Sequence, residues 1–272
     1  MEEDKGFEQE YNLFEEKFDS DGLYKEPNIN DLKEVNYISS FDADGKPVIH
    51  QKIATRFEEL HSEKYDKYLV PLFADDPIIG LLFRGNGVIV GSYLITAAHV
   101  AQSEDKSISY PKLYFNYEGN LKTVSDGKRL FDGRGCHLHS EYLDDIIIYE
   151  LTDVHSEFEL NDAPIEESLE MAAVWYNRDD DNCTTVHPHN YVCKVHSLEV
   201  RHANHAWKNC FTILNQWQIF NGNSGGAVFR NNKIYGVLSR ANIVNTFKGT
   251  AIDARYIQMK IDEFELGKRR GN

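Results

Sequence analysis

The sequence predicts a mainly β domain over residues 67–272, preceded by an acidic N-terminal extension of mixed α/β character and closed by a C-terminal helix. Short apolar runs separated by Gly, Asn, Asp and Pro fill the chain from residue 67 onward, and this spacing is typical of an antiparallel β-barrel or sandwich. Tyr and Phe number 15 each, and aromatic side chains favour half-buried pleated sheets. Near the C-terminus, Ile257, Ile261 and Phe264 lie at helical spacing.

Residues 1–66 differ from the rest of the chain in charge. They hold 18 acidic and 8 basic residues, a net charge of −10, whereas residues 67–272 hold 26 and 21, a net charge of −5. We interpret residues 1–66 as an extension and residues 67–272 as the main domain. A segment of this length buries too little apolar surface to fold alone, so we expect it to pack on the main domain or on a protein partner. A regulatory extension and a simple packed extension both agree with this pattern.

Three local patterns predict the structure of the extension. Four aromatic residues at helical spacing predict a helix over residues 7–18. These residues are Phe7, Tyr11, Phe14 and Phe18. Residues 36–50 predict a hairpin with Asp44-Gly45 at its turn. Residues 51–65 again show helical spacing and predict a second helix.

Charge and composition also narrow the choice of partners. The net charge of −15 argues against a nucleic-acid partner, because an acidic surface does not attract a phosphate backbone. No apolar run approaches the roughly 18 residues that a membrane span requires, and the acidic N-terminus lacks the apolar core of a secretory signal. The four cysteines are few for a secreted disulfide scaffold, and we interpret them as reduced thiols. We therefore expect a cytoplasmic protein with no membrane partner.

Three segments of the β domain carry residues suited to catalysis. In the first, an apolar strand pair delivers His99 directly after two alanines. In the second, Asp145 precedes the apolar run Ile-Ile-Ile-Tyr, which must be a buried strand. In the third, Ser224 lies in a glycine-rich turn that leads into another apolar strand. The three residues occur in the order His, Asp, Ser.

This set of residue types suits nucleophilic catalysis. A serine hydroxyl is a poor nucleophile until a positioned base takes its proton, and histidine is the side chain best suited to do so near neutral pH. An acid on the other side of the imidazole fixes its tautomer and stabilises its charged form. The sequence therefore predicts His99, Asp145 and Ser224 as catalytic residues. The glycines permit a turn that presents backbone N–H groups to an oxyanion, and we assign this role to the N–H groups of Gly222 and Ser224.

These segments resemble the signatures of trypsin-like serine proteases. ITAAHV resembles their TAAH motif, Asp145-Ile-Ile-Ile-Tyr-Glu-Leu resembles their D-I-x-L strand, and GNSGGAVF is similar to their G-D/N-S-G-G-P motif in the form of HtrA-like bacterial and some viral members. The resemblance covers about residues 67–262. It implies a chymotrypsin-like fold of two six-stranded antiparallel β-barrels with the active site between them. It also implies a serine endopeptidase that forms an acyl-enzyme with protein or peptide substrates and needs no cofactor.

Some positions depart from the usual pattern of that family. Ala227 follows the second glycine where proline is usual, and no cysteine flanks His99. Asn223 takes the place of an acid that pairs with a newly cut N-terminus in zymogen-derived members. Activation by such a cut is therefore not indicated.

The resemblance also implies positions that meet the substrate. They are Gln218, Ser239 and Ala241, with Gln218 at the base of the pocket for the residue before the cut bond. No acid occupies that base, so a preference for Lys or Arg is not indicated and we expect an uncharged or polar residue there. Arg240, between the two strand positions, is better interpreted as a solvated charge.

We expect no metal site. Two histidine pairs lack an acid or cysteine at a recognised ligand spacing, and surface histidines are the better interpretation. They are His187 with His189 and His202 with His205. A metal bound by Cys183 and Cys193 is a weaker alternative to two half-buried thiols. The alternative function is a catalytically silent protease fold used for binding, and a standalone intracellular protease with a specific protein substrate is the interpretation we prefer.

Overall fold

The computed structural model describes residues 33–42, 44–54, 61–62, 65–76, 80–102, 109–133, 142–164, 169–176, 186–199, 208–215, 219, 222–242 and 247–271. The chain divides into two compact units, one of Met1–Val35 with Lys52–Glu59 and the other of Asn36–Gln51 with Leu60–Asn272. In the first unit, the described residues are the start of strand β1 (Lys33–Phe41) and the end of strand β2 (Pro47–Ala54). Strands β3 to β17 and the C-terminal helix all belong to the second unit.

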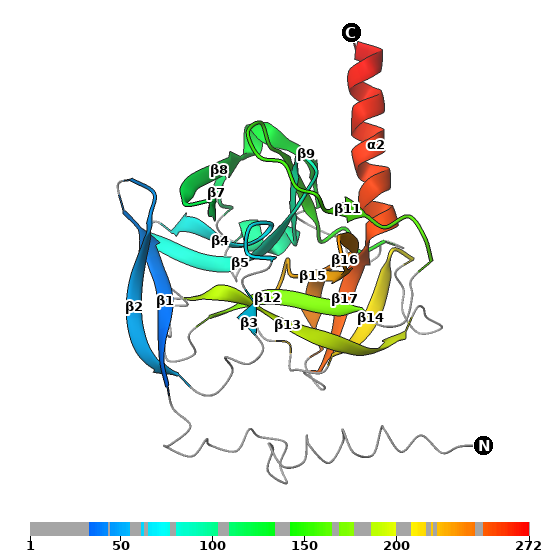
Figure 1. Cartoon of the computed structure of the whole chain (residues 1–272). Helices are drawn as coiled ribbons and strands as arrows, with labels where there is room; N and C mark the ends of the chain where they lie inside the picture. The colour runs from blue at the N-terminus through cyan, green and yellow to red at the C-terminus, as the bar shows by residue number, and fades with distance from the viewer. Residues whose placement is uncertain are drawn as a thin grey trace, which may run out of the picture. The chain divides into compact units, whose positions relative to one another are not determined.

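Seven antiparallel strands form the first sheet, in the spatial order β8-β7-β4-β5-β6-β10-β9. They are β4 (Leu69–Asp76), β5 (Gly80–Val90), β6 (Tyr93–Thr96), β7 (Lys112–Tyr117), β8 (Asn120–Ser125), β9 (Arg129–Asp132) and β10 (Ile147–Glu150). The cyan and green strands of Figure 1 show how this sheet curls on itself. Side chains alternate between core and surface, as in β7, where Leu113, Phe115 and Tyr117 are buried.

Six strands of the second sheet close into a barrel. They are β12 (Glu170–Tyr176), β13 (Val186–Glu199), β14 (Cys210–Asn215), β15 (Ala227–Arg230), β16 (Lys233–Ala241) and β17 (Lys248–Asp253). The barrel closes because β12 pairs with β15 on one side and with β13 on the other. Its buried side chains Phe229, Ile234, Val237 and Ile252 belong to one apolar cluster with residues of the first sheet such as Val88 and Ile95. Two short strands pair with strands of the barrel, β11 (Glu159–Leu160) with β16 and β3 (His61–Ser62) with β13.

The predicted fold class is confirmed: the structure is mainly β, with a closed six-stranded barrel, a curled sheet and a C-terminal helix. The first sheet differs in detail from a closed six-stranded barrel. It gains a seventh strand because β10 pairs with β9 as well as with β6. Among the described residues, β8 and β9 are its two edges and no pairing joins them.

The predicted hairpin is present as β1 and β2, which are neighbours in the second sheet next to β13. The Asp42 carboxylate accepts hydrogen bonds from the N–H groups of Asp44 and Lys46, and Gly45 adopts a φ of +79°. The turn approaches the first sheet closely, since a Cβ on Gly45 would lie 2.7 Å from Leu121 Cβ. The hairpin from residue 36 to residue 51 thus lies in the same compact unit as both sheets.

The predicted helix over residues 51–65 is wrong where the structure describes this segment. Residues 51–54 continue β2, and residues 61–62 form β3. Pairing with neighbouring strands satisfies the backbone hydrogen-bonding groups of these residues. It outweighs the helical spacing between Ile53 and the apolar residues that follow it. The predicted helix over residues 7–18 lies outside the described residues.

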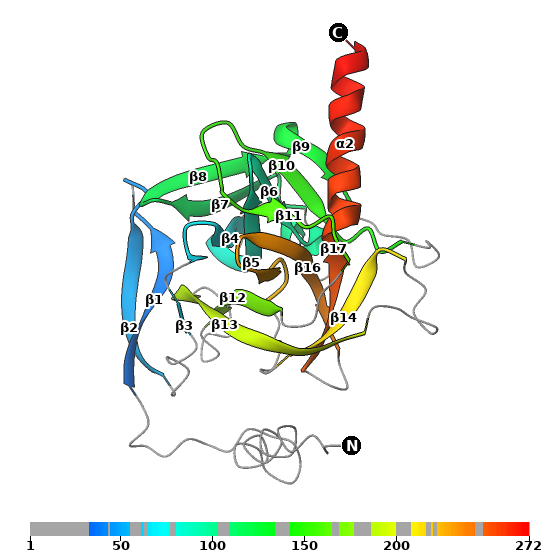
Figure 2. The same ribbon diagram turned by 45° about the vertical axis from the view of Figure 1, so that its right-hand side comes forward.

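The predicted C-terminal helix is present as α2 (Ala254–Gly271). The Asp253 carboxylate accepts a hydrogen bond from the Arg255 N–H and so caps the first turn. Tyr256, Ile257 and Ile261 are buried in an apolar cluster that includes residues of both sheets. Figure 2 shows α2 rising from the end of β17 beside β11, with its last turns beyond the strands.

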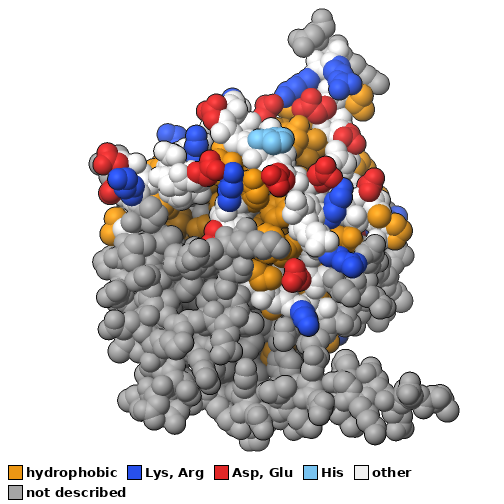
Figure 3. Space-filling model, viewed as in Figure 1, with side chains coloured by type: hydrophobic (Ala, Val, Ile, Leu, Met, Phe, Trp, Pro, Cys, Tyr) orange, Lys and Arg blue, Asp and Glu red, His pale blue; other side chains and the backbone are white. Residues whose placement is uncertain are grey.

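Charged side chains of both signs are interspersed on the described part of the face shown in Figure 3. Within the described part of the chain, no helix combines the length and apolar character needed to cross a membrane.

Candidate active site

His99 lies at the end of strand β6, in the short 3₁₀ helix η4 (Ala98–Ala101). Ala97 and Ala98, directly before His99, are 0% and 1% exposed and pack in the apolar cluster of the first sheet. The N–H of Gln102 donates to the carbonyl of His99 at 3.1 Å and closes the turn. The His99 side chain itself is 40% exposed, so one edge of the ring remains accessible.

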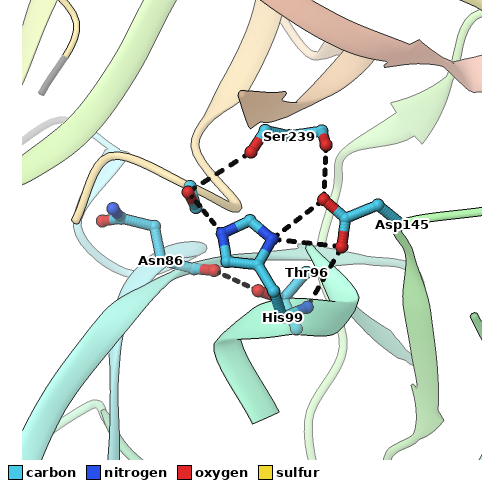
Figure 4. Close-up of polar contacts among 6 residues, drawn as sticks. Asn86, Thr96, His99, Asp145 and Ser239 are labelled. Carbon is cyan, nitrogen blue, oxygen red and sulfur yellow. Dashed lines mark hydrogen bonds and ion pairs between the residues drawn. The ribbon is translucent and has the colours of Figure 1, made fainter. Parts of the chain in front are cut away.

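Asp145 lies just before strand β10, and its side chain is only 8% exposed. Its carboxylate accepts hydrogen bonds from His99 Nδ1 at 2.8 and 3.1 Å and from the His99 backbone N–H at 3.1 Å. The Ser239 hydroxyl donates to the same carboxylate. Figure 4 shows the carboxylate between the imidazole and Ser239. A buried carboxylate with these donors is well satisfied and holds the ring from one side.

Burial by itself raises the pKa of Asp145, but the donors around the carboxylate outweigh it. The hydrogen bond and charge of His99, the Ser239 hydroxyl and the His99 backbone N–H together hold the pKa of Asp145 below its ordinary value. The acid therefore stays ionised. Because an ionised carboxylate only accepts hydrogen bonds, Nδ1 of His99 must carry the proton between them. The neutral ring then presents Nε2 as an acceptor.

Ser224 lies on the opposite side of the imidazole from Asp145, with its Oγ 2.8 Å from His99 Nε2. The serine belongs to the turn that leads into β15 of the barrel, whereas the histidine belongs to the first sheet. The Ser224 hydroxyl also lies 3.4 Å from the carbonyl oxygen of Ser239. The structure thus brings together the three side chains that the sequence placed 46 and 79 residues apart.

The turn around Ser224 requires glycine at two positions. Gly222 and Gly225 have φ values of +92° and +81°, a backbone conformation that side chains rarely permit. A Cβ on Gly225 would lie 1.8 Å from the carbonyl oxygen of Asn86, which is closer than any atom can approach. In the described part of the chain, the N–H groups of Gly222 and Ser224 donate to no acceptor. They are available to an oxyanion, which is the role the sequence assigned to them.

The predicted substrate-binding residues have different outcomes. Ser239 is 1% exposed in β16 and its hydroxyl is directed to Asp145, so this side chain supports the acid. Ala241 is half-buried at the end of β16, where it pairs with Gly249 of β17. Gln218 lies outside the described residues. A role for these positions in substrate binding stays a prediction.

Asn86 was missed by the sequence reasoning and contacts the serine turn twice. Its backbone N–H donates to the carbonyl of Ser224 at 2.7 Å, and its Nδ2 donates to the carbonyl of Gly222 at 2.8 Å. Its own carbonyl accepts a hydrogen bond from the Thr96 hydroxyl at 2.5 Å. A sequence signal was available, because Asn86 is a polar residue between Gly85 and Gly87 in a strand that is mainly apolar.

The segment before Asp145 is also held by residues that the sequence did not single out. The buried Asn209 side chain accepts from the N–H of Leu143 and donates to its carbonyl, each at 2.8 Å. Asp144 is directed away from His99 and accepts a hydrogen bond from the hydroxyl of Tyr256 in α2. Adjacent carboxylates therefore have different partners, as expected for neighbouring residues of an extended chain.

Comparisons with known proteins bear on the family and the fold of this chain. The sequence matches the trypsin family over residues 75–257, which is more than half of the chain. A search of curated protein sequences found no match. Among solved structures, a collagenase (HL collagenase) has a TM-score of 0.51 and 12% identity, covering 72% of this chain and 92% of its own.

Two bacterial proteases are similar at slightly lower scores. A protease from M. tuberculosis in its active form has a TM-score of 0.49 and 14% identity, covering 73% of this chain and 81% of its own. The serine endoprotease from Yersinia pestis also has a TM-score of 0.49 and 14% identity, covering 78% of this chain and 68% of its own. The family match, together with the closed barrel and curled sheet, shows that this chain belongs to the trypsin family of proteases and has its chymotrypsin fold.

Proposed function

We propose that the protein is a serine endopeptidase in which Ser224 is the nucleophile, His99 the general base and Asp145 the acid that orients and stabilises the imidazole. One observation carries this proposal: Ser224 Oγ lies 2.8 Å from His99 Nε2 while Nδ1 of the same ring is held by the Asp145 carboxylate. This geometry leaves the neutral base aimed at the hydroxyl whose proton it must take.

The first half-reaction follows from these contacts. His99 Nε2 takes the hydroxyl proton as Ser224 Oγ bonds to the carbonyl carbon of the peptide, and the carbonyl oxygen becomes an oxyanion. The N–H groups of Gly222 and Ser224 donate to that oxyanion. His99 then gives its proton to the amide nitrogen, the C–N bond breaks and the amine product leaves. Ser224 remains as an ester of the acyl fragment.

The second half-reaction uses the same groups with water in place of the serine. His99 Nε2 takes a proton from water, whose oxygen bonds to the ester carbon and forms a second oxyanion. The proton returns from His99 to Ser224 Oγ as the ester bond breaks, and the acid product leaves. Asp145 keeps its negative charge throughout and stabilises the imidazolium in both steps.

The setting of this reaction is part of the same proposal. A cytoplasmic protease that cuts a specific protein substrate agrees with the low cysteine content. The acidic residues 1–66 would then act as an extension that packs on the protease domain or meets a protein partner. A variant that begins at Tyr65 tests the regulatory form of this idea, and unchanged rate and substrate choice would contradict it.

A fluorophosphonate probe tests the proposed chemistry directly, because it labels only an activated serine. We expect labelling of Ser224 and cleavage of a proteome-derived peptide library, and Ser224→Ala should lower the rate of cleavage by about 10⁴- to 10⁶-fold. Ser92→Ala is a matched control, since Ser92 Oγ also lies near a histidine, 3.4 Å from His155 Nδ1. A protein that binds peptides but is neither labelled nor active would favour the silent binding fold instead.

A further inference from the structure

We infer that Asn86 is a positioning residue of this active site, whose side-chain amide holds the turn that presents the oxyanion donors Gly222 and Ser224. The inference rests on the proposed function, since it concerns the same reaction. It adds a residue of the first sheet to the machinery that stabilises the oxyanion, although both donors belong to the turn before β15 of the barrel.

Asn86 is a buried residue that contacts the serine turn, and it does not belong to the protein surface. It lies in the middle of β5 and is 2% exposed. Figure 4 shows its carbonyl directed to Thr96 and its side-chain amide directed away from the imidazole of His99. The amide therefore does not act on the base. Its Nδ2 donates to the carbonyl oxygen of Gly222 at 2.8 Å.

Asn86 donates a hydrogen bond to the carbonyl of each of the two residues whose N–H groups are the proposed oxyanion donors. The Asn86 side chain holds the carbonyl of Gly222, and the Asn86 backbone N–H holds the carbonyl of Ser224 at 2.7 Å. Since a peptide group is planar, fixing a carbonyl fixes the whole peptide unit that follows its residue. Asn86 thus fixes the peptide units Gly222–Asn223 and Ser224–Gly225, and these two units flank the Asn223–Ser224 unit that carries the N–H of Ser224.

The Gly222 end of the turn needs such a support. Gly222 lacks a Cβ and has a φ of +92°, so its own sterics restrict the backbone little. The Ser224 end is restrained further, because the Gly225 N–H donates to the carbonyl of Leu238 at 2.7 Å. Among the described residues, the side chain of Asn86 supplies the hydrogen bond recorded for the Gly222 carbonyl. Removing it would loosen the backbone between the two donor residues, whose N–H groups must lie within about 3 Å of the oxyanion.

The test compares two substitutions of the same size with a matched control. Asn86→Leu removes the amide, and Asn86→Asp replaces the donor by an acceptor of the same shape. Asn161→Leu is the control, because Asn161 is 7% exposed and its Nδ2 donates to the carbonyl of Ala163 at 2.8 Å. Asn161 follows β11, which pairs with the first two residues of β16, whereas Ser239 lies near the other end of that strand. Rates are measured on a peptide that the unsubstituted protein cleaves in a proteome-derived library, together with the fluorophosphonate labelling rate.

We expect both Asn86 variants to lower kcat by about 30- to 300-fold with KM changed less than about threefold, because oxyanion contacts form in the transition state. Thermal unfolding should shift no more than in Asn161→Leu, which keeps its kcat. An Asn86 variant that folds and matches the control in kcat would overturn the inference, and so would failure of both variants to fold, because Asn86 would then serve the fold. If the unsubstituted protein shows no activity that depends on Ser224, the proposed function fails and the inference with it.

Discussion

The two sheets contribute different halves of the site. The first sheet supplies the proton-handling pair, since His99 follows β6 and Asp145 precedes β10, and these two strands are direct neighbours. The barrel supplies the nucleophile and the oxyanion donors from one turn before β15. The base and acid are therefore aligned within a single sheet, whereas the nucleophile is aligned only when the two sheets pack together.

Two residues link these halves. Ser239 of β16 donates to Asp145, and Asn86 of β5 holds the turn of Ser224. Each sheet thus supports the part of the site that belongs to the other sheet. The comparison teaches that catalytic alignment in this chain depends on packing between sheets as well as on the order within each.

The largest effect is expected from a change within the first sheet. Asp145→Asn should lower kcat by about 10⁴-fold, because an amide at this position favours the wrong tautomer of His99. Asp144→Asn is the matched control, because Asp144 contacts Tyr256 and not the imidazole, and it should lower kcat less than about tenfold. Steady-state kinetics of both variants decide the assignment, and the reverse order of severity would refute it.

The second-largest effect is expected from a substitution at the contact between the two sheets. Gly225→Ala would place a Cβ 1.8 Å from the Asn86 carbonyl oxygen, and a backbone atom cannot move aside cheaply. We expect a loss of more than about 3 kcal/mol in the free energy of unfolding. Gly119→Ala is the control, because Gly119 has a similar φ of +77° but no atom within 4 Å.

The control should lose only about 1–2 kcal/mol, the cost of the left-handed conformation itself. Urea denaturation of both variants measures the difference, which isolates the close approach of the two sheets. Equal losses of unfolding free energy in the two variants would mean that the two sheets can move apart at this point without loss of stability.

A smaller effect is expected from the second link between the sheets. Ser239→Ala removes one donor from a buried carboxylate, so it should lower the free energy of unfolding near neutral pH by about 1–3 kcal/mol. It should also raise the pKa of Asp145 from its depressed value towards the ordinary one.

The sign of the pH dependence follows from that depressed pKa. A carboxylate whose pKa is lower in the folded state stabilises the protein above its unfolded pKa, near 3.9, and loses this contribution as the pH falls through the folded pKa. The acid-induced loss of stability should therefore be smaller in Ser239→Ala than in the unsubstituted protein, and it should end at a higher pH. Denaturation curves between pH 2 and 7 test this, and identical acid limbs would contradict the assigned support.

No effect is expected from metal removal. The proposed mechanism moves protons among His99, Ser224 and water, and uses no metal. Incubation with EDTA should leave the labelling and cleavage rates unchanged within about twofold. A loss of activity that zinc restores would overturn both this prediction and the division of roles between the two sheets.

The sequence by itself determined the features that depend on local patterns. Alternating apolar residues predicted the strands, and the spacing of Ile257 and Ile261 predicted α2, because both periods follow from backbone geometry alone. The three segments around His99, Asp145 and Ser224 were recognisable because each needs particular residue types next to one another. The hairpin at Asp44-Gly45 was visible for the same reason.

Only the tertiary structure decided the features that depend on contacts between distant residues. Closure of the barrel through β12, the seventh strand of the first sheet and the strand at residues 51–54 all follow from pairing partners that local spacing does not reveal. The contact of Asn86 with Gly222 joins residues 136 positions apart, and that of Asn209 with Leu143 spans 66. The position of Asn86 between two glycines marks it as unusual, but the sequence does not show the role of either asparagine, because a side-chain amide gains its function from the carbonyl that folding places beside it.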